Sequence, residues 1–198
     1  MADSKLSALT ELSVVDLSDD VYVVDDTGPT SYKLGTDRLF GLSNHICQGR
    51  LTLTSGTPVA VADVTCATNV YFTPYNGDKV ALYDGTRWRL YSFTELTLAL
   101  GTLTSGLPYD VFLYDNAGTL TLESLAWTNG TTRATALVTQ NGVYCKTGAL
   151  TRRYLGTFYT TSTTTTEDSG GGVTTQVGGK RFLWNMYNRR PRPLLVMD

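Results

Sequence analysis

Histidine, charge and long apolar runs are scarce in this chain, and each scarcity argues against a class of function. A catalytic nucleophile–histidine pair, or a metal site with a histidine ligand, would have to use the single histidine, His45. Charged residues make up only 17% of the chain, and its net charge of -2 gives no general attraction to nucleic acid or anionic membranes. No apolar run approaches the roughly 18 residues that a membrane-spanning helix needs. We therefore expect a protein that neither binds nucleic acid nor inserts into a membrane.

Cysteine is also sparse, with Cys47, Cys66 and Cys145 lying far apart in the sequence. The opening residues, MADSKLSALTELSVVDLSDD, lack the positively charged start and apolar block of a secretory signal. An odd number of cysteines without such a signal favours reduced thiols in a protein made in a cytoplasm. A Cys47–Cys66 disulfide is the less favoured alternative.

Threonine, glycine and tyrosine are abundant, and this mixture favours strands and tight turns over helices. After residue 45, short runs of strand formers alternate with turn residues, and Asn76-Gly77, Asn129-Gly130 and Asn141-Gly142 are hairpin signals. The regular spacing predicts an all-β domain over residues 46–198, an antiparallel β-sandwich with a jelly-roll-like arrangement, although a barrel gives the same pattern. Within it, the Thr- and Gly-rich residues 160–179 are expected to form a long loop or an exposed hairpin.

Residues 1–45 differ from the rest because their acidic residues outnumber their basic ones. The stretch VYVVDDTGPTSYKLG reads as strand, turn and strand, and TDRLFGL as the start of a short helix. An isolated hairpin is only marginally stable in water. We therefore expect this segment to be an extended arm with a hairpin that packs on a partner.

Candidate catalytic groups are few. His45 and Cys47 would lie on one side of a strand, but no second pair completes a metal site. Asp110, Asp115 and Glu123 are the only candidates in the β-domain for the paired carboxylates of a glycosidase. They read more simply as strand-end, turn and solvent-facing strand residues. There is no P-loop and no dinucleotide fingerprint, so we expect no enzymatic activity and no cofactor.

Several aromatic residues of the predicted β-domain are able to stack on sugars. The candidates for glycan contact are Trp88, Tyr91, Trp127 and Tyr144. Core packing and strand pairing are the more common roles of such residues in small β-domains. A carbohydrate-binding module is therefore kept as the alternative function.

The C-terminal stretch KRFLWNMYNRRPRPLLVMD, residues 180–198, is basic and aromatic although the whole chain is slightly acidic. Nucleic-acid binding requires a wider basic surface than this. Arginine is favoured at protein interfaces because its planar fork pairs with carboxylates, and the acidic first segment supplies carboxylates. We expect an assembly interface with a neighbouring copy or another partner. Its residues would be Arg181, Trp184, Tyr187, Arg189, Arg190 and Arg192 on one side and Asp19, Asp20, Asp25 and Asp26 on the other.

Two parts of the chain resemble proteins of tailed bacteriophages. The opening MADSKLSALTEL, followed by DDVYVVDD and SYKLGTDRLF, is similar to the N-terminal attachment segment of phage structural proteins, fibres especially. The later sequence, including YNGDKVALYDG and WNMYNRRPRPL, resembles an all-β module that recurs in phage and prophage proteins of the virion surface. Together the two resemblances cover nearly the whole chain.

The resemblance implies a location and not a reaction. It implies a virion protein made in the host cytoplasm, attached through residues 1–45 and displaying residues 46–198. It leaves a tail fibre or adaptor and a head decoration protein or head fibre equally open, and it implies a homotrimer. The expected partners are other copies of the chain, capsid or tail proteins, and a host surface glycan. No catalytic residue is carried over, because the family has no catalytic motif to match.

Overall fold

The computed structural model describes residues 20–24, 31–35, 43–171, 178–194 and 196, and the chain divides into two units, residues 1–41 and 42–198. In the first unit, β1 (Asp20–Val24) pairs antiparallel with β2 (Ser31–Gly35). These are the two strands expected from the sequence. The connecting turn and the expected short helix after Gly35 lie outside the described residues.

The second unit is all-β, as expected, and its sheets are antiparallel. A short 3-10 helix, η1 (Ser43–His45), precedes its strands. The strands are β3 (Gly49–Thr52), β4 (Val64–Ala67), β5 (Asn69–Pro74), β6 (Lys79–Tyr83), β7 (Trp88–Ser92), β8 (Leu96–Ala99), β9 (Pro108–Asn116), β10 (Thr119–Ala126), β11 (Leu137–Gln140), β12 (Val143–Lys146), β13 (Ala149–Tyr159), β14 (Thr166–Ser169), β15 (Lys180–Arg181) and β16 (Leu183–Asn185).

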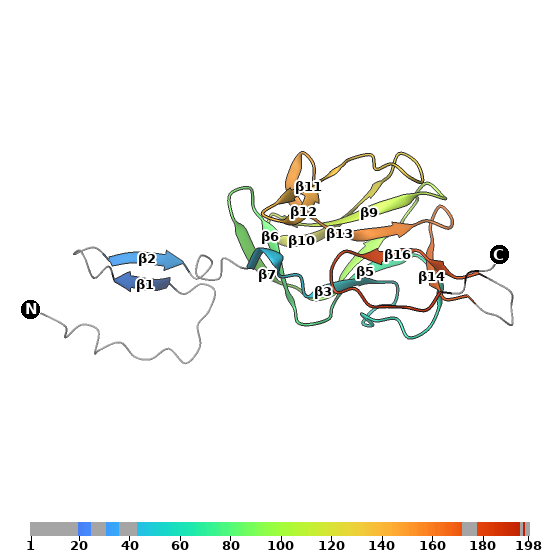
Figure 1. The fold of residues 1–198 in the computed structure, drawn as a ribbon, viewed down its shortest axis with the longest axis horizontal. Coiled ribbons are helices and arrows are strands. Elements are labelled where there is room, and N and C mark those ends of the chain that lie inside the picture. The colour runs from blue at the N-terminus through green and yellow to red at the C-terminus, as the bar shows by residue number, and fades with distance from the viewer. Residues whose placement is uncertain (1–19, 25–30, 36–42, 172–177, 195, 197–198) are drawn as a thin grey trace, which may run out of the picture. The chain divides into compact units, whose positions relative to one another are not determined.

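The largest sheet of the second unit has the strand order β10-β9-β13-β12-β11, and β16 also pairs with β13. Figure 1 shows β9, β10 and β13 running side by side. Three smaller sheets have the orders β3-β5-β8, β15-β14-β4 and β6-β7. The largest sheet and two of the smaller ones share one core, because Leu51, Phe72, Val80, Val111 and Leu155 come from different strands and belong to the same buried cluster. The β15-β14-β4 sheet contributes Val64 and Ala67, which are partly buried against that cluster.

The turn sequences explain where the strands reverse. Asn141 and Gly142 both have positive φ, 49° and 82°, and they connect β11 to β12 in the expected tight hairpin. Asn76-Gly77 is also a turn, but the predicted hairpin is wrong because β5 and β6 belong to different sheets. Both edges of β5 are already paired, with β3 and β8, so no edge remains for β6.

The C-terminal strand β16 lies very close to β13. A Cβ atom added to Gly156 would lie only 2.1 Å from the backbone oxygen of Trp184. Gly156 also lies beside the register shift where β13 pairs with β9. The small residue therefore lets the C-terminal segment approach the central strand of the largest sheet.

The Thr- and Gly-rich residues 160–179 differ from the loop or exposed hairpin that we expected. They contain β14, in which Thr166, Glu167 and Asp168 are buried. The acidic pair is held by ion pairs from β15, with 2.8 Å between Lys180 and Glu167 and 3.2 Å between Arg181 and Asp168. Residues 172–177 of the stretch lie outside the described part of the chain.

Candidate functional site

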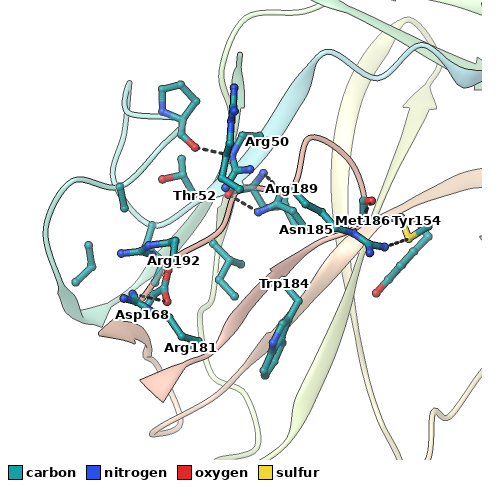
Figure 2. A pocket seen from close by; sticks show the side chains of 17 residues that line it. Arg50, Thr52, Tyr154, Asp168, Arg181, Trp184, Asn185, Met186, Arg189 and Arg192 are labelled. Atoms are coloured by element: carbon teal, nitrogen blue, oxygen red, sulfur yellow. Dashed lines mark hydrogen bonds and ion pairs between the residues drawn. The ribbon is translucent and has the colours of Figure 1, made fainter. Parts of the chain in front are cut away.

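A pocket of about 440 Å³ lies between β3, the loop that follows it and the C-terminal segment (Figure 2). We call it the arginine pocket. Its charged lining residues are Arg50, Asp168, Arg181, Arg189, Arg190 and Arg192. Five arginines thus face one aspartate among the residues that line it.

Two asparagines attach the C-terminal segment to β3 and to the residues just before it, and one of them, Asn185, also lines the pocket. The side chain of Asn185 accepts a hydrogen bond from Leu51 N–H at 2.7 Å and donates one to Leu51 C=O at 3.0 Å. Asn188 donates to the carbonyls of Cys47 and Gly49 at 2.7 and 3.0 Å. A side-chain amide carries both a donor and an acceptor, so Asn185 pairs with β3 as a neighbouring strand would.

Among the described residues, Asp168 is the only anionic group that lines the arginine pocket, and it is shared by two arginines. Arg181 lies 3.2 Å from one of its oxygens, and Arg192 contacts the other (Figure 2). Burial raises the pKa of Asp168 above its usual value even though both arginines favour the ionised form. Asp168 therefore forms ion pairs with two of the five arginines.

Arg50 and Arg190 are held by neutral groups. Arg50 donates to the carbonyl of Pro58 at 2.8 Å and also to that of Asn188. Burial lowers the pKa of Arg50, and the like charges of Arg190 and Arg192 act in the same direction. Arg190 hydrogen-bonds the Tyr75 hydroxyl and lies 5.2 Å from the centre of its ring.

Arg189 is exposed at the pocket, and its bonds are local. Its guanidinium donates to the Met186 carbonyl at 3.3 Å. Within the described part of the chain, no carboxylate lies within ion-pair distance of Arg189 or Arg190. The arginine pocket thus keeps an excess of positive charge that its single aspartate does not balance.

The structure brings together most of the C-terminal residues that we predicted for assembly. Arg181, Arg189, Arg190, Arg192 and Trp184 all line the arginine pocket. In contrast with the expectation of a tail offered wholly to a neighbour, three of these arginines contact Asp168 or Tyr75 of their own chain.

The remaining predicted assembly residues lie elsewhere. The Arg153 guanidinium lies 4.5 Å from the centre of the Tyr187 ring. Burial raises the pKa of Tyr187 to about 12. Asp20 begins β1, whereas Asp19, Asp25 and Asp26 lie outside the described residues.

Two residues of the pocket were missed at the level of sequence. Arg50 lies in RLTLT, which reads as an ordinary strand, and Asp168 lies in the stretch expected to be a loop. The adjacent Glu167 and Asp168, alone among threonines, serines and glycines, were the one available signal. Because their ion-pair partners are distant in sequence, the two acidic residues alone did not indicate where a site would form.

A second hollow, of about 590 Å³, contains two of the four predicted glycan-contact residues, Trp127 and Tyr144. The Arg133 guanidinium lies 4.5 Å from the Trp127 ring centre, and the buried Nε1 of Trp127 has no hydrogen-bond partner. Trp88 and Tyr91 lie on β7 and do not line this hollow. Trp88 donates instead to the Asn141 side chain at 3.1 Å, and the Tyr91 hydroxyl lies 3.2 Å from an Asp115 oxygen.

The three candidate carboxylates are engaged by their own chain. Asp110 is only 1% exposed and lies 2.9 Å from Arg133 Nε. Burial opposes the ionisation of Glu123, but hydrogen bonds from Lys146 and Arg152 outweigh it and lower the pKa of Glu123. Glu123 is thus an ion-pair partner and not the solvent-facing residue that we expected.

Asp115 lies near the end of β9, not in the turn that we expected, and its side chain accepts a hydrogen bond at 2.7 Å from Gly118 N–H in the turn to β10. The three candidate carboxylates thus form contacts within their own chain, Asp110 and Glu123 with basic side chains and Asp115 with the backbone of the following turn.

Cysteine and histidine are not grouped for metal binding in the described residues, where no cluster of three or more His, Cys, Asp or Glu side chains was found. All three cysteines are described and none forms a disulfide, so the Cys47–Cys66 alternative is wrong. Burial raises the pKa of Cys47 to about 11, which keeps it as a thiol at neutral pH. His45, at the end of η1, is exposed.

No protein-family model, curated protein or solved structure matches this chain. Among the described residues, no helix has the length and apolar character needed to cross a membrane. The case for a function therefore depends on the chain's own residues and their geometry.

Proposed function

We propose that the protein is a non-enzymatic structural component of a tailed-phage virion. Residues 1–45 would attach it to the particle, and residues 46–198 would be displayed at the surface as a homotrimer. The observation that carries the proposal is the division into a hairpin-bearing first unit and an all-β second unit, near Gly41 and Leu42. This is the organisation that the resemblance to phage virion proteins implies.

The finer architecture that we propose for the second unit is a β-sandwich of jelly-roll type. Its support is the single core shared by strands of the largest sheet and of the β3-β5-β8 sheet, including Leu51, Phe72 and Val111. Two sheets that bury one face each against a common core are the defining feature of a sandwich.

The decisive experiment is to locate the protein on intact phage particles by immunogold electron microscopy, with an antibody against residues 46–198. Label over the whole head would identify a decoration protein or head fibre, and label confined to the tail would identify a fibre or adaptor. Particles that contain the protein's gene but carry no label would overturn the proposal.

A carbohydrate-binding module is the second candidate, and the hollow that contains Trp127 and Tyr144 favours it. Thr131, Thr132 and Arg133 also line this hollow, so aromatic faces lie beside groups that hydrogen-bond sugars. Under this alternative, Trp127→Ala lowers affinity for host polysaccharide by about two- to tenfold, because an aromatic stacking contact typically contributes about 0.5–1.5 kcal/mol.

The matched control is Trp88→Ala, which removes a tryptophan outside the hollow. Binding is measured by isothermal titration calorimetry with polysaccharide from the host surface. Equal losses in the two variants, or no binding by the unmodified protein, would remove this candidate.

A further inference from the structure

We infer that the arginine pocket is a carboxylate-binding site whose occupant is the acidic N-terminal segment of a second copy of this chain. The inference rests on the proposed function as a self-assembling virion component and deepens it by naming the contact. The pocket and the N-terminal segment carry opposite charges.

The first step is the charge imbalance in the pocket. Five guanidinium groups and one carboxylate line the same hollow of about 440 Å³. Asp168 forms its ion pairs with Arg181 and Arg192, so one carboxylate charge stands against five guanidinium charges. Like charges gathered in a partly desolvated pocket repel one another, and a bound anion relieves that repulsion.

The second step is the accessibility of the remaining arginines. Arg189 and Arg190 are exposed, and both lie at the pocket. Arg50 is buried beside them, with its Nε bonded to a carbonyl and not to a carboxylate. Guanidinium groups donate hydrogen bonds in a planar fork that matches a carboxylate, so side chains of aspartate fit this arrangement.

The third step is the source of the carboxylates. Residues 16–26, DLSDDVYVVDD, carry five aspartates and neither lysine nor arginine. Asp20 begins β1 and so belongs to a strand with an ordered partner in β2. The five negative charges of this segment complement the positive excess of the pocket, whereas the β-domain has no comparable acidic run.

The test is a charge swap followed by sedimentation velocity and light scattering on the full chain. Arg189→Glu with Arg190→Glu reverses the pocket, and Asp19→Lys with Asp20→Lys reverses the segment. Each pair should raise the dissociation constant for self-association at least about tenfold, because like charges then face each other. The four substitutions together should restore association to within about threefold of the unmodified chain.

Two controls keep the result specific. Lys79→Glu makes the same change of charge as Arg189→Glu on β6, outside the lining of the pocket, and should leave self-association unchanged. Arg189→Glu alone spares the contact between Arg190 and Tyr75, so a weaker association in this variant cannot be assigned to loss of that contact. Melting temperatures are measured for every variant to confirm that each one folds.

An unmodified chain that stays monomeric, or a four-substitution chain that fails to recover, would overturn the inference. If pocket reversal weakens association but segment reversal does not, the occupant is a different anion, such as an acidic glycan or another protein, and the second-copy assignment is wrong. A monomeric chain would also contradict the proposed homotrimer. None of these outcomes changes where the antibody label lies on the particle, so failure of this inference and failure of the proposed virion location are distinguishable.

Discussion

At the scale of single residues, Arg153 shows how a charge is accommodated in the core. The residue is 1% exposed, and its guanidinium donates to the carbonyls of Asn44 and Ala81 at 2.8 Å and of His45 at 3.3 Å. It also lies over the Tyr187 ring. In the described part of the chain no carboxylate pairs with it, so backbone carbonyls and aromatic faces provide its stabilisation.

We predict that Arg153→Met lowers the free energy of unfolding by about 3 kcal/mol, because the buried Ala81 carbonyl and the part-buried carbonyls of Asn44 and His45 lose their donor. Urea denaturation measures the change. The control is Arg152→Met at the preceding residue of β13, which removes a partly exposed ion-pair partner of Glu123. This substitution should lower the free energy of unfolding by about 1 kcal/mol or less. Similar losses in the two variants would show that the buried bonds contribute little.

At the scale of structural elements, the β6–β7 hairpin depends on the carboxylate of Asp84. Arg89 lies 2.5 Å from one of its oxygens, and the backbone N–H groups of Thr86 and Arg87 donate to the other at 2.8 and 2.9 Å. The hydrogen bond from Arg89, followed by that from the Arg87 backbone, lowers the pKa of Asp84 from 3.8 to about 2.

A lowered pKa means that the folded protein binds a proton on Asp84 less readily than the unfolded chain does. The stabilisation from Asp84 is therefore present above about pH 4 and is lost as the pH falls through about 2. In a carbon-detected NMR titration, Arg89→Met should raise the midpoint of Asp84 towards 3.8. The control Arg87→Met, whose guanidinium is 4.0 Å away, should move it less. Equal shifts would contradict the assigned cause.

Local signals in the sequence were sufficient for some elements and not for others. The Asn141-Gly142 hairpin was predictable because both strands are its immediate neighbours. The strands on either side of Asn76-Gly77, β5 and β6, were expected to pair with each other, but each pairs with other strands. The turn residues alone therefore predicted the wrong strand pairing. In the candidate site, the arginines of the C-terminal segment were predicted as a group from their spacing. Arg50 and Asp168 were not, because only the folded chain brings them there.

At the scale of the whole molecule, the buried cluster lies entirely within residues 47–187. We predict that a chain beginning at Leu42 keeps the melting temperature of the β-domain to within about 2 °C, because it retains every residue of that cluster. Calorimetry makes the measurement. A fall of more than about 8 °C would show that the β-domain needs residues 1–41.

The opposite truncation is the matched control. A chain that ends at Asn185 lacks Asn188 and Arg192, and it loses the hydrogen bonds to Cys47 and Gly49 and the ion pair with Asp168. We expect it to melt well below the chain that begins at Leu42.

The attachment of Asn185 and Asn188 to β3 also bears on how the chain is synthesised. The hydrogen-bond partners of Leu51 lie 134 residues further along the chain, so β3 emerges from the ribosome long before the side chain that completes it. Contacts this distant in sequence slow folding, because a long loop must close before they form. One edge of β3 is able to pair early with β5, but the other stays open until the C-terminal segment is made, and such an open strand edge is where chaperones would protect a nascent chain from mispairing.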